Sequence, residues 1–320
     1  MKNILILERK DYSDRALQFY KKLGQFYFFE DLTAVQKKKI LSTITILVVR
    51  LKHEINKVWL DKMPGLEIIV SPTTGLNHID LAEADKRKIR MISLKGHTDF
   101  LKNITSTAEE AFALLLALIR NIPWAFDDVK SGRWDRDVWK GHQLSGKTLG
   151  LLGCGRLGKI MAKYGQAFGM KVIGADPNVD VSALLKDGIK KVTIAELFKQ
   201  ADVVSVHVNL EEDTRELVNE KLFSLMKRDA YFINTSRGEI IDEKALLHVL
   251  KNKKIAGAAL DVMENEVEGK HLNNNPLIEY AKKHKNLIVV PHIGGATYEA
   301  MHITEEYVAD LVLKHYQYGK

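Results

Sequence analysis

The stretch from Thr148 to Asp176 reads TLGLLGCGRLGKIMAKYGQAFGMKVIGAD. Thr148–Leu152 is an apolar run of strand length, and it is followed at once by the glycine-rich hexapeptide GCGRLG and a helical pattern of apolar residues. A second apolar run, Lys171–Ala175, ends in Asp176. Strand, glycine turn, helix, strand and acid in this order are the layout of a dinucleotide-binding βαβ unit.

Each part of this unit has a chemical reason. Gly153 permits a turn that a Cβ would strain, Gly155 lets the backbone approach a pyrophosphate, and Gly158 lets helix and strand pack closely. The helix N-terminus supplies unpaired N–H groups for the phosphates. Asp176 lies 18 residues after Gly158, where a carboxylate can accept from both ribose hydroxyls and would repel a 2′-phosphate. The pattern predicts a Rossmann domain that binds NAD rather than NADP. The alternative for Asp176 is an ordinary turn residue at a strand end.

Length and composition are those of a globular protein with two domains. The chain has 320 residues, of which 46% are hydrophobic and 28% charged, and this length suits two domains with separate cores. Its one cysteine, Cys154, cannot form an intrachain disulfide, which fits a reducing compartment. We interpret Cys154 as a small residue tolerated in the phosphate turn, not as a nucleophile.

The sequence favours a cytoplasmic protein that binds neither membranes nor nucleic acids. The opening MKNILILERK has too short an apolar run for a signal peptide. The longest apolar run, Ala111–Ile119, is about half of what a membrane span needs. The formal charge is +7, but the lysine runs are scattered and not interleaved with aromatic residues, which is typical of a solvated surface. We expect no metal site.

The first hundred residues alternate between strand-like and helical segments. Helical, charged segments lie at Asp11–Leu23 and Leu81–Lys88. Strands are predicted at Asn3–Leu7, Tyr27–Phe29, Thr43–Val49, Leu66–Val70 and Arg90–Ile92. This alternation indicates a parallel sheet with helices on both faces. Because no glycine-rich turn follows the first strand, this domain is not expected to bind the cofactor.

A polar segment, KGHTDFLKNITST (Lys95–Thr107), leads into an apolar helix at Ala108–Arg120. Thr107 and Glu110 have the spacing of a capping box, and we place the first domain crossing here, with the helix buried between two domains. Further strands are predicted at Asp202–Val208, Tyr231–Asn234, Ile255–Leu260 and Leu287–Val290, with helices at Glu220–Met226, Glu243–Lys251 and Tyr298–Tyr316. The last helix should return to the first domain. Two such α/β layers would leave a cleft at their carboxyl strand ends.

Three ionisable residues directly follow predicted strands of the cofactor domain or the short segments after them. Arg237 follows FINTS, Glu266 follows GAALDVMEN, and His292 follows LIVVP. An arginine to bind a carboxylate, a histidine to move a proton and an acid to hold that histidine charged would make a hydroxy-acid dehydrogenase site. Taken singly, each residue type is more often a surface residue or one satisfied in the core.

Several motifs together resemble the D-isomer-specific 2-hydroxyacid dehydrogenase family. They are GCGRLG, SVHVNLEEDTRELVN, FINTSRGEIIDEKAL, GAALDVMENE and VVPHIGGATYEA, with SPTTGLNHID and TAEEAFALLLALIR upstream. The resemblance covers nearly the whole chain. It implies an α/β fold of two doubly wound parallel-sheet domains, with a Rossmann NAD domain (102–292) inserted in a flavodoxin-like substrate domain (1–101 and 293–320). It also implies an NAD-dependent enzyme and a homodimer.

The resemblance assigns a role to each motif residue. Arg237 binds the carboxylate and carbonyl oxygen of the substrate, His292 is the acid/base, and Glu266 pairs with it. The backbone amides of Gly75 and Leu76 cradle the substrate carboxylate. The cofactor site is formed by Gly153, Gly155, Arg156, Leu157, Gly158, Asp176, His207, Val208, Thr214, Thr235 and Asp261, with Asp261 near the carboxamide. NADH then delivers hydride to C2 of a 2-keto acid, and His292 protonates the alkoxide.

The chain departs from the family pattern at three places. Asn209 and Val267 stand where the family usually has proline, and Lys95–Thr107 is longer than the usual entry to the interdomain helix. Because that longer segment is expected near the cleft, the far end of the substrate is the part that the resemblance transfers least directly.

Two further arginines bear on the substrate. Arg50, in LVVRLKHEI, and Arg136, in GRWDRDVW, resemble positions that meet a phosphate in the D-3-phosphoglycerate dehydrogenases. They favour a substrate with a second anionic group, such as 3-phosphoglycerate or 3-phosphohydroxypyruvate, whereas the alternative for Arg136 is a surface ion pair. Other hypotheses are a glyoxylate, hydroxypyruvate or D-lactate-type reductase and a non-enzymatic, NAD-sensing scaffold like the family's corepressors. A formate dehydrogenase is disfavoured because those enzymes pair the histidine with glutamine.

Overall fold

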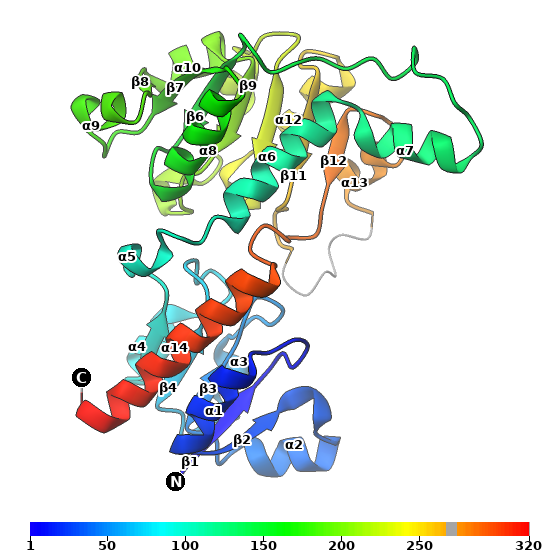
Figure 1. Cartoon of the computed structure of the whole chain (residues 1–320). Helices are drawn as coiled ribbons and strands as arrows, with labels where there is room; N and C mark the ends of the chain where they lie inside the picture. The colour runs from blue at the N-terminus through cyan, green and yellow to red at the C-terminus, as the bar shows by residue number, and fades with distance from the viewer. Residues whose placement is uncertain (267–273, 320) are drawn as a thin grey trace. The chain divides into compact units, whose positions relative to one another are not determined.

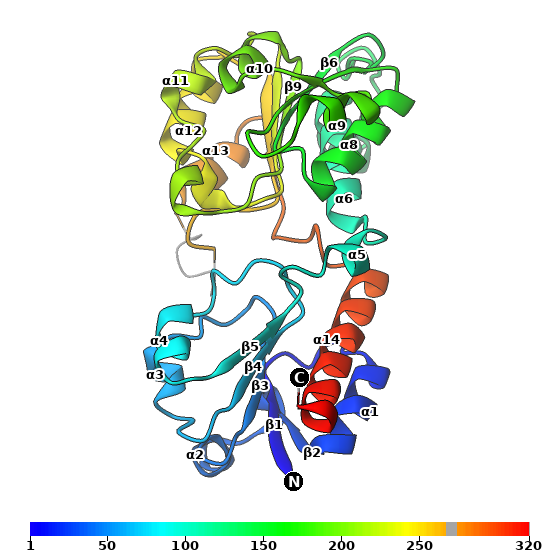
Figure 2. The same cartoon turned by 90° about the vertical axis from the view of Figure 1, so that its left-hand side faces the viewer.

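The computed structural model describes residues 1–266 and 274–319; Val267 lies outside the described residues. The chain divides into two compact units, unit 1 (Met1–Ile104 with Ala296–Lys320) and unit 2 (Thr105–Gly295). Each unit is one parallel β-sheet with helices on both faces (Figures 1 and 2). The prediction of two parallel-sheet α/β domains is therefore confirmed. Within the described ranges, no helix is long and apolar enough to cross a membrane.

Unit 1 has five strands in the order β2-β1-β3-β4-β5, which is the flavodoxin-like order. The strands are β1 (Lys2–Ile6), β2 (Gly24–Phe28), β3 (Ile46–Val48), β4 (Ile68–Ser71) and β5 (Arg90–Ser93). The helices are α1 (Asp14–Leu23), α2 (Ala34–Leu41), α3 (Lys57–Leu60), α4 (Leu81–Lys86), α5 (Thr98–Leu101) and α14 (Tyr298–Tyr318), with a short 3-10 turn η1 (Phe29–Asp31).

Successive strand residues of unit 1 face opposite layers, and both layers are apolar. Ile4 and Ile6 of β1 join one core cluster with α1 and α14, whereas Leu5 joins the other with α2, α3 and α4. This is the two-residue period of a strand buried on both faces. In Figure 2, α1 and α14 lie side by side along one face of the sheet.

The longer segment Lys95–Thr107 is partly helical, and its residues up to Ile104 pack within unit 1. Phe100 of α5 stacks on Tyr307 of α14 with ring centroids 3.7 Å apart. The Tyr307 hydroxyl also lies 2.8 Å from Nδ1 of His97. These contacts give the extra residues of this segment a structural role on α14.

Unit 2 has seven strands in the order β12-β11-β10-β9-β6-β7-β8. The chain starts in the middle at β6, fills one side with β7 and β8, and then crosses to β9 and its neighbours, as in a Rossmann fold. The strands are β6 (Thr148–Leu152), β7 (Lys171–Ala175), β8 (Lys190–Lys191), β9 (Val203–Val206), β10 (Tyr231–Asn234), β11 (Gly257–Leu260) and β12 (Leu287–Val289).

Helices cover both faces of this sheet (Figure 1). On one face α6 and α8 pack through Leu115, Leu118 and Met161; on the other, α10 to α13 pack through Phe198, Leu246 and their apolar neighbours. The helices are α6 (Ser106–Ile119), α7 (Ile122–Lys130), α8 (Arg156–Ala167), α9 (Val181–Lys186), α10 (Ile194–Gln200), α11 (Glu220–Phe223), α12 (Glu243–Lys251) and α13 (Pro276–Ala281), with 3-10 turns η2 (Glu212–Thr214) and η3 (Gly238–Ile240).

The predicted start of the long apolar helix is wrong. Helix α6 begins at Ser106, its N-cap is Thr105, and no described side chain caps it. Thr107 and Glu110 therefore lie inside the helix and form no capping box. The helix starts earlier because Ser106 and Ala108 are already buried in unit 2, so packing sets the boundary rather than the spacing of polar residues.

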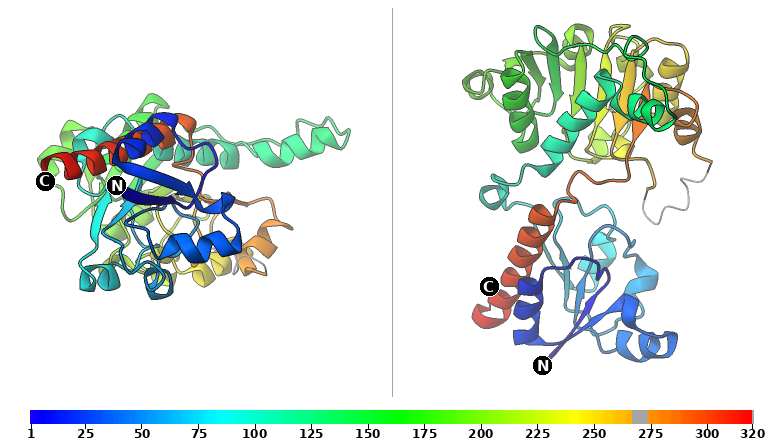
Figure 3. Two further views of the ribbon diagram at one scale, coloured as in Figure 1. Left: turned by 90° about the horizontal axis from the view of Figure 1, so that it is seen from below. Right: turned by 45° about the vertical axis from the view of Figure 1, so that its right-hand side comes forward.

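Helix α7 and the residues that follow it extend away from the rest of unit 2 (Figure 3). Asn121 adopts a left-handed conformation with φ 56° and ends α6, and α7 begins at the next residue. Five large apolar side chains of this arm are exposed: Ile122, Phe126, Val129, Trp134 and Val138. We call residues 122–138 the arm.

Candidate active site

The residues predicted in unit 2 follow the carboxyl ends of its strands. Gly153 follows β6, Asp176 follows β7 and His207 follows β9, while Thr235 and Arg237 follow β10, Asp261 follows β11, and His292 follows β12. Because all strands run parallel, these positions share one edge of the sheet, where open α/β sheets bind ligands.

The glycine turn has the geometry that the motif predicts. Gly153 has φ 93°, and a Cβ there would lie 2.8 Å from backbone atoms of His207 and Val208. A Cβ on Gly158 would lie 2.3 Å from the carbonyl oxygen of Gly153. A Cβ on Gly155, in contrast, would meet no described atom within 4 Å. The turn is thus closed on the protein side and open beside Gly155, where a pyrophosphate can approach α8.

Asp176 ties the first two strands of this edge together. Its Oδ2 accepts the N–H of Cys154 at 2.8 Å, and its Oδ1 accepts the N–H of Asn178 at 2.9 Å. Burial raises the pKa of the Cys154 thiol to about 12, so the thiol stays protonated. A thiol in that state is not a nucleophile, in agreement with its interpretation as a packing residue.

The other predicted cofactor residues lie around the turn. Arg156 and Leu157 form the first turn of α8. Nε2 of His207 lies 2.9 Å from the hydroxyl of Ser205, and burial lowers the pKa of His207 to about 4, so the ring is neutral near pH 7. Thr214 donates to the carbonyl oxygen of Asn209 at 2.7 Å and closes the loop after β9.

Thr235 has a buried hydroxyl with no partner among the described residues. Buried polar groups are almost always hydrogen-bonded, so an orphaned hydroxyl at this edge points to a polar ligand. The open side of Gly155, the uncapped N-terminus of α8, the carboxylate of Asp176 and this hydroxyl together fit NAD.

His292 and Glu266 form the central pair of the site. Nδ1 of His292 is hydrogen-bonded to Oε1 of Glu266, and Oε2 of Glu266 accepts the N–H of Met263 at 3.0 Å. The second oxygen thus fixes the carboxylate while the first faces the imidazole. His292 has φ 53°, a left-handed conformation that is uncommon outside glycine, and it therefore needs support from its neighbours.

Asp261 supplies that support. Its backbone oxygen accepts the N–H of His292 at 2.8 Å, its Oδ1 accepts the N–H of Ile293 at 2.6 Å, and its Oδ2 accepts the N–H of Gly294 at 2.8 Å. Asp261 is 1% exposed, and burial raises its pKa although these N–H groups oppose the shift. We predicted Asp261 only as a cofactor residue; its role as a clamp on three successive N–H groups carries no local sequence signal.

Arg237 lies beside this pair. Its Nη1 donates to the carbonyl oxygen of Ser236 at 2.6 Å. Burial lowers the pKa of Arg237, and the charges of Glu266, Glu239 and Asp261 act in the opposite direction. A partly desolvated guanidinium next to the histidine pair can bind a substrate carboxylate strongly.

Two residues that we did not predict, Gly238 and Glu243, bring together the turn that carries Arg237 and the turn that carries Glu266. A Cβ on Gly238 would lie 2.0 Å from the carbonyl carbon of Met263 and 2.2 Å from the nitrogen of Glu264. Oε1 of Glu243 accepts the N–H of Glu264 at 2.7 Å, and its Oε2 accepts from the side chain of Asn275 at 3.3 Å. The turn after β10 therefore rests directly on the turn that carries Glu266.

The predicted substrate residues of unit 1 are Gly75, Leu76 and Arg50. The backbone N–H groups of Gly75 and Leu76 donate to no described residue, as a carboxylate cradle requires. Arg50 makes an ion pair with buried Glu305 and donates to the carbonyl oxygen of Lys10 at 3.0 Å. Its guanidinium thus already has a matched negative charge.

Arg136 lies in the arm of unit 2, and its side chain is 94% exposed. Its Nε is 4.0 Å from Oδ1 of Asp137, a separation at which an exposed ion pair contributes little. Among the described residues, no group of three or more histidine, cysteine or acidic side chains could hold a metal ion.

Comparison with known proteins identifies the family. Residues 112–294 match the family of D-isomer specific 2-hydroxyacid dehydrogenases, NAD binding domain. The chain is 36% identical over 312 residues to the glyoxylate reductase of Thermococcus litoralis, covering 94% of this chain and 89% of that protein. It is 34% identical over 312 residues to the D-3-phosphoglycerate dehydrogenase of Methanocaldococcus jannaschii, covering 97% of this chain and 57% of that protein. The chain thus spans little more than half the length of that relative.

Solved structures that are similar to this chain include further dehydrogenases and reductases. An acyclic imino acid reductase in complex with NADPH and D-Arg has a TM-score of 0.81 and 30% identity, covering 100% of this chain and 98% of that one. The D-lactate dehydrogenase from Aquifex aeolicus, complexed with NAD and lactic acid, has a TM-score of 0.81 and 28% identity, covering 99% and 96%. The chain belongs to the D-isomer-specific 2-hydroxyacid dehydrogenase family, with unit 2 as its NAD-binding domain.

Proposed function

We propose that this protein is an NAD-dependent D-2-hydroxyacid dehydrogenase, with unit 1 as its substrate domain. The observation that carries the proposal is the hydrogen-bonded His292–Glu266 pair beside Arg237, at the strand edge that also holds the phosphate turn. An enzyme that adds hydride to C2 of a keto acid needs a group that binds the carboxylate and a group that protonates the developing alkoxide. Arg237 and His292 supply these two groups.

Each residue of the site has its own role in the reduction. NADH, when bound, supplies the hydride to C2. Arg237 orients the substrate carboxylate, and the N–H groups of Gly75 and Leu76 are donors that unit 1 offers to an acid. Because Nδ1 of His292 is engaged by Glu266, the proton on Nε2 is the one that passes to the carbonyl oxygen. Glu266 stabilises the imidazolium before the transfer and the backbone clamp of Asp261 holds the ring in place.

We infer that the substrate carries a second anionic group, with 3-phosphohydroxypyruvate as the first candidate. Arg50 lines a hollow of about 280 Å³ in unit 1 together with Lys10 and His302, and Arg136 presents an exposed guanidinium. A second candidate is a short keto acid such as glyoxylate or hydroxypyruvate. The ion pair between Arg50 and Glu305 favours this candidate, since a guanidinium with a matched carboxylate attracts a further anion less.

A panel of 2-keto acids scored by NADH oxidation tests both candidates. If the second anionic group is recognised, Arg136→Ala should lower kcat/KM for 3-phosphohydroxypyruvate at least tenfold. The kcat/KM for glyoxylate should stay within about twofold of the wild type. Lys140→Ala, a change in the same exposed segment, is the control. An equal effect on both substrates, or a higher wild-type kcat/KM for glyoxylate, would establish the short keto acid. No turnover of any keto acid would favour the NAD-sensing scaffold instead.

We also propose that the protein is a homodimer joined through the arm. Phe126 is 62% exposed and Trp134 is 89% exposed, and large apolar side chains gathered on one projecting segment mark a protein–protein contact. Phe126→Glu with Trp134→Glu should convert the dimer to a monomer in light scattering. Val35→Glu, on α2 and also exposed, should leave the dimer intact. A wild-type monomer at micromolar concentration would contradict the proposal.

A further inference from the structure

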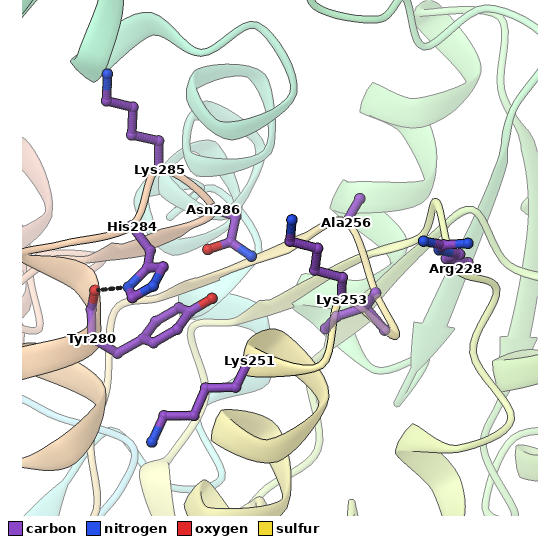
Figure 4. A pocket seen from close by; sticks show the side chains of 9 residues that line it. Arg228, Lys251, Lys253, Ala256, Tyr280, His284, Lys285 and Asn286 are labelled. Carbon is purple, nitrogen blue, oxygen red and sulfur yellow. Dashed lines mark hydrogen bonds between the residues drawn. The ribbon is translucent and has the colours of Figure 1, made fainter.

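A second hollow lies in unit 2, at the edge of the sheet opposite Arg237 and His292. It has a volume of about 520 Å³, within the range of small-molecule sites. The segments that precede β10, β11 and β12 line it. Because the three strands are parallel neighbours, these segments return to the same amino-terminal edge and converge on one place (Figure 4).

Each of these segments contributes a cation. Arg228 comes before β10, Lys251 and Lys253 before β11, and Lys285 before β12. The lining contains no acidic residue among the described side chains that form it. Four cationic residues therefore line one hollow, and the positive potential that they create favours the binding of an anion.

Three of these cations differ from two basic neighbours in the same segments. Lys227 pairs with Asp202 at 2.7 Å, and Lys282 pairs with Glu279 at 2.5 Å. Arg228, Lys251 and Lys253 pair with no described acid. Lys285 lies 4.4 Å above the ring of Trp139, and its charge also reaches Asp128. Lys227 and Lys282, next to the hollow, are thus neutralised by acids, whereas Arg228, Lys251 and Lys253, which line it, are not.

Neutral polar groups complete the lining. Oδ1 of Asn286 is buried and has no partner among the described residues. The ring of Tyr280 is held in place by stacking on His284, with centroids 3.9 Å apart and an angle of 6°. Figure 4 shows that the hydroxyl end of Tyr280 and the amide of Asn286 point toward one another across the hollow. A buried acceptor of this kind can accept a hydrogen bond from a ligand that also carries a donor.

We propose that this hollow is a binding site for a phosphate monoester that carries a free hydroxyl group, separate from the NAD and substrate sites. The phosphate lies among the four cations, and the hydroxyl donates to Oδ1 of Asn286. A small ligand fits better than a nucleic acid, because the four cationic residues line one hollow instead of following a stripe. Tyr280 is only 6% exposed, which leaves no face for base stacking.

The test is a calorimetric titration of the full chain, saturated with NADH, with glycerol 2-phosphate as the probe. The wild type should bind it, and Lys251→Gln with Lys253→Gln should weaken binding at least tenfold. Asn286→Ala should weaken the binding of glycerol 2-phosphate but leave the affinity for sulfate within about twofold of the wild type. Lys199→Gln with Lys282→Gln, which removes two surface charges outside the hollow, is the matched control.

Three results would overturn the proposal. Loss of binding in Arg237→Lys, with the hollow unchanged, would place the probe at the active site. Equal binding of sulfate and glycerol 2-phosphate would leave only a general anion site. Displacement of the probe by a short single-stranded RNA that binds more tightly would make this surface a nucleic-acid contact. Because all these readouts are binding, they do not depend on which acid the enzyme reduces.

Discussion

Replacement of Gly238 by alanine should separate the turn that carries Arg237 from the turn that carries Glu266. Gly238 directly follows Arg237, and its α-carbon faces the peptide between Met263 and Glu264, where an added Cβ would lie 2.0 and 2.2 Å from backbone atoms. Backbone atoms cannot rotate away as the end of a side chain can. The turn after β10 must therefore move as a whole from the turn that carries Glu266.

The size of the movement sets the expected loss. Carbon atoms in contact lie about 3.5–4.0 Å apart, so the two turns must separate by roughly 1.5 Å. A misplacement of about 1 Å can cost on the order of a hundredfold in rate, whereas overpacking a core costs about 1–3 kcal/mol of stability. We expect Gly238→Ala to fold, to bind NADH with unchanged affinity, and to lose at least a hundredfold in kcat/KM.

Steady-state kinetics with the best keto acid, NADH fluorescence titration and circular dichroism measure these three outcomes. Gly65→Ala is the control, because its Cβ would lie an ordinary 3.7 Å from the nearest described atom, the carbonyl oxygen of Ile44. A folded Gly238→Ala enzyme with kcat/KM within twofold of wild type would refute the argument that this glycine holds Arg237 against the Glu266 turn.

Three further predictions concern single side chains of unit 2. NADH should be preferred over NADPH by more than tenfold, above ~1.4 kcal/mol, and Asp176→Ala should shrink this preference mainly by weakening NADH; equal use of both cofactors by the wild type would contradict it. Glu266→Gln should lower kcat for keto-acid reduction, because an amide does not stabilise imidazolium; an unchanged kcat in steady-state kinetics would assign Glu266 a structural role only. Since burial raises the pKa of Cys154 to about 12, iodoacetamide at pH 8 should modify it only in denaturant, as mass spectrometry can show; rapid labelling of the native protein would refute its burial.

The sequence predicted the bounds of a strand correctly where a residue of the cofactor motif directly follows that strand. Thr148–Leu152 and Lys171–Ala175 are strands with the predicted bounds, because a glycine turn ends the first and Asp176 ends the second. Strand β8 was not predicted. It consists of Lys190 and Lys191 at the sheet edge, and two charged residues carry no apolar period from which a strand could be recognised.

Long-range contacts of the site could not be predicted in the same way. The residues at the strand ends follow from local motifs, yet their partners lie far along the chain. Arg50 and Glu305 are 255 residues apart, and nothing near either position indicates the other. The hollow lined by Arg228 and Lys285 could not be predicted for the same reason. Only the order of the strands in the sheet brings the segments before β10 and β12 together.

Asp261 shows how a motif residue can serve a purpose beyond the one its family suggests. The resemblance places Asp261 near the carboxamide of NAD, but both of its carboxylate oxygens already accept N–H groups, from Ile293 and Gly294. An asparagine would offer one acceptor oxygen and turn an NH₂ group toward the other N–H, leaving a buried donor unsatisfied at a cost of about 1–3 kcal/mol. The third N–H of the clamp belongs to His292, whose left-handed backbone has to be held. The requirement for aspartate at this position therefore follows from the N–H groups of Ile293 and Gly294, which fix the turn after His292, whether or not the same carboxylate also meets the cofactor.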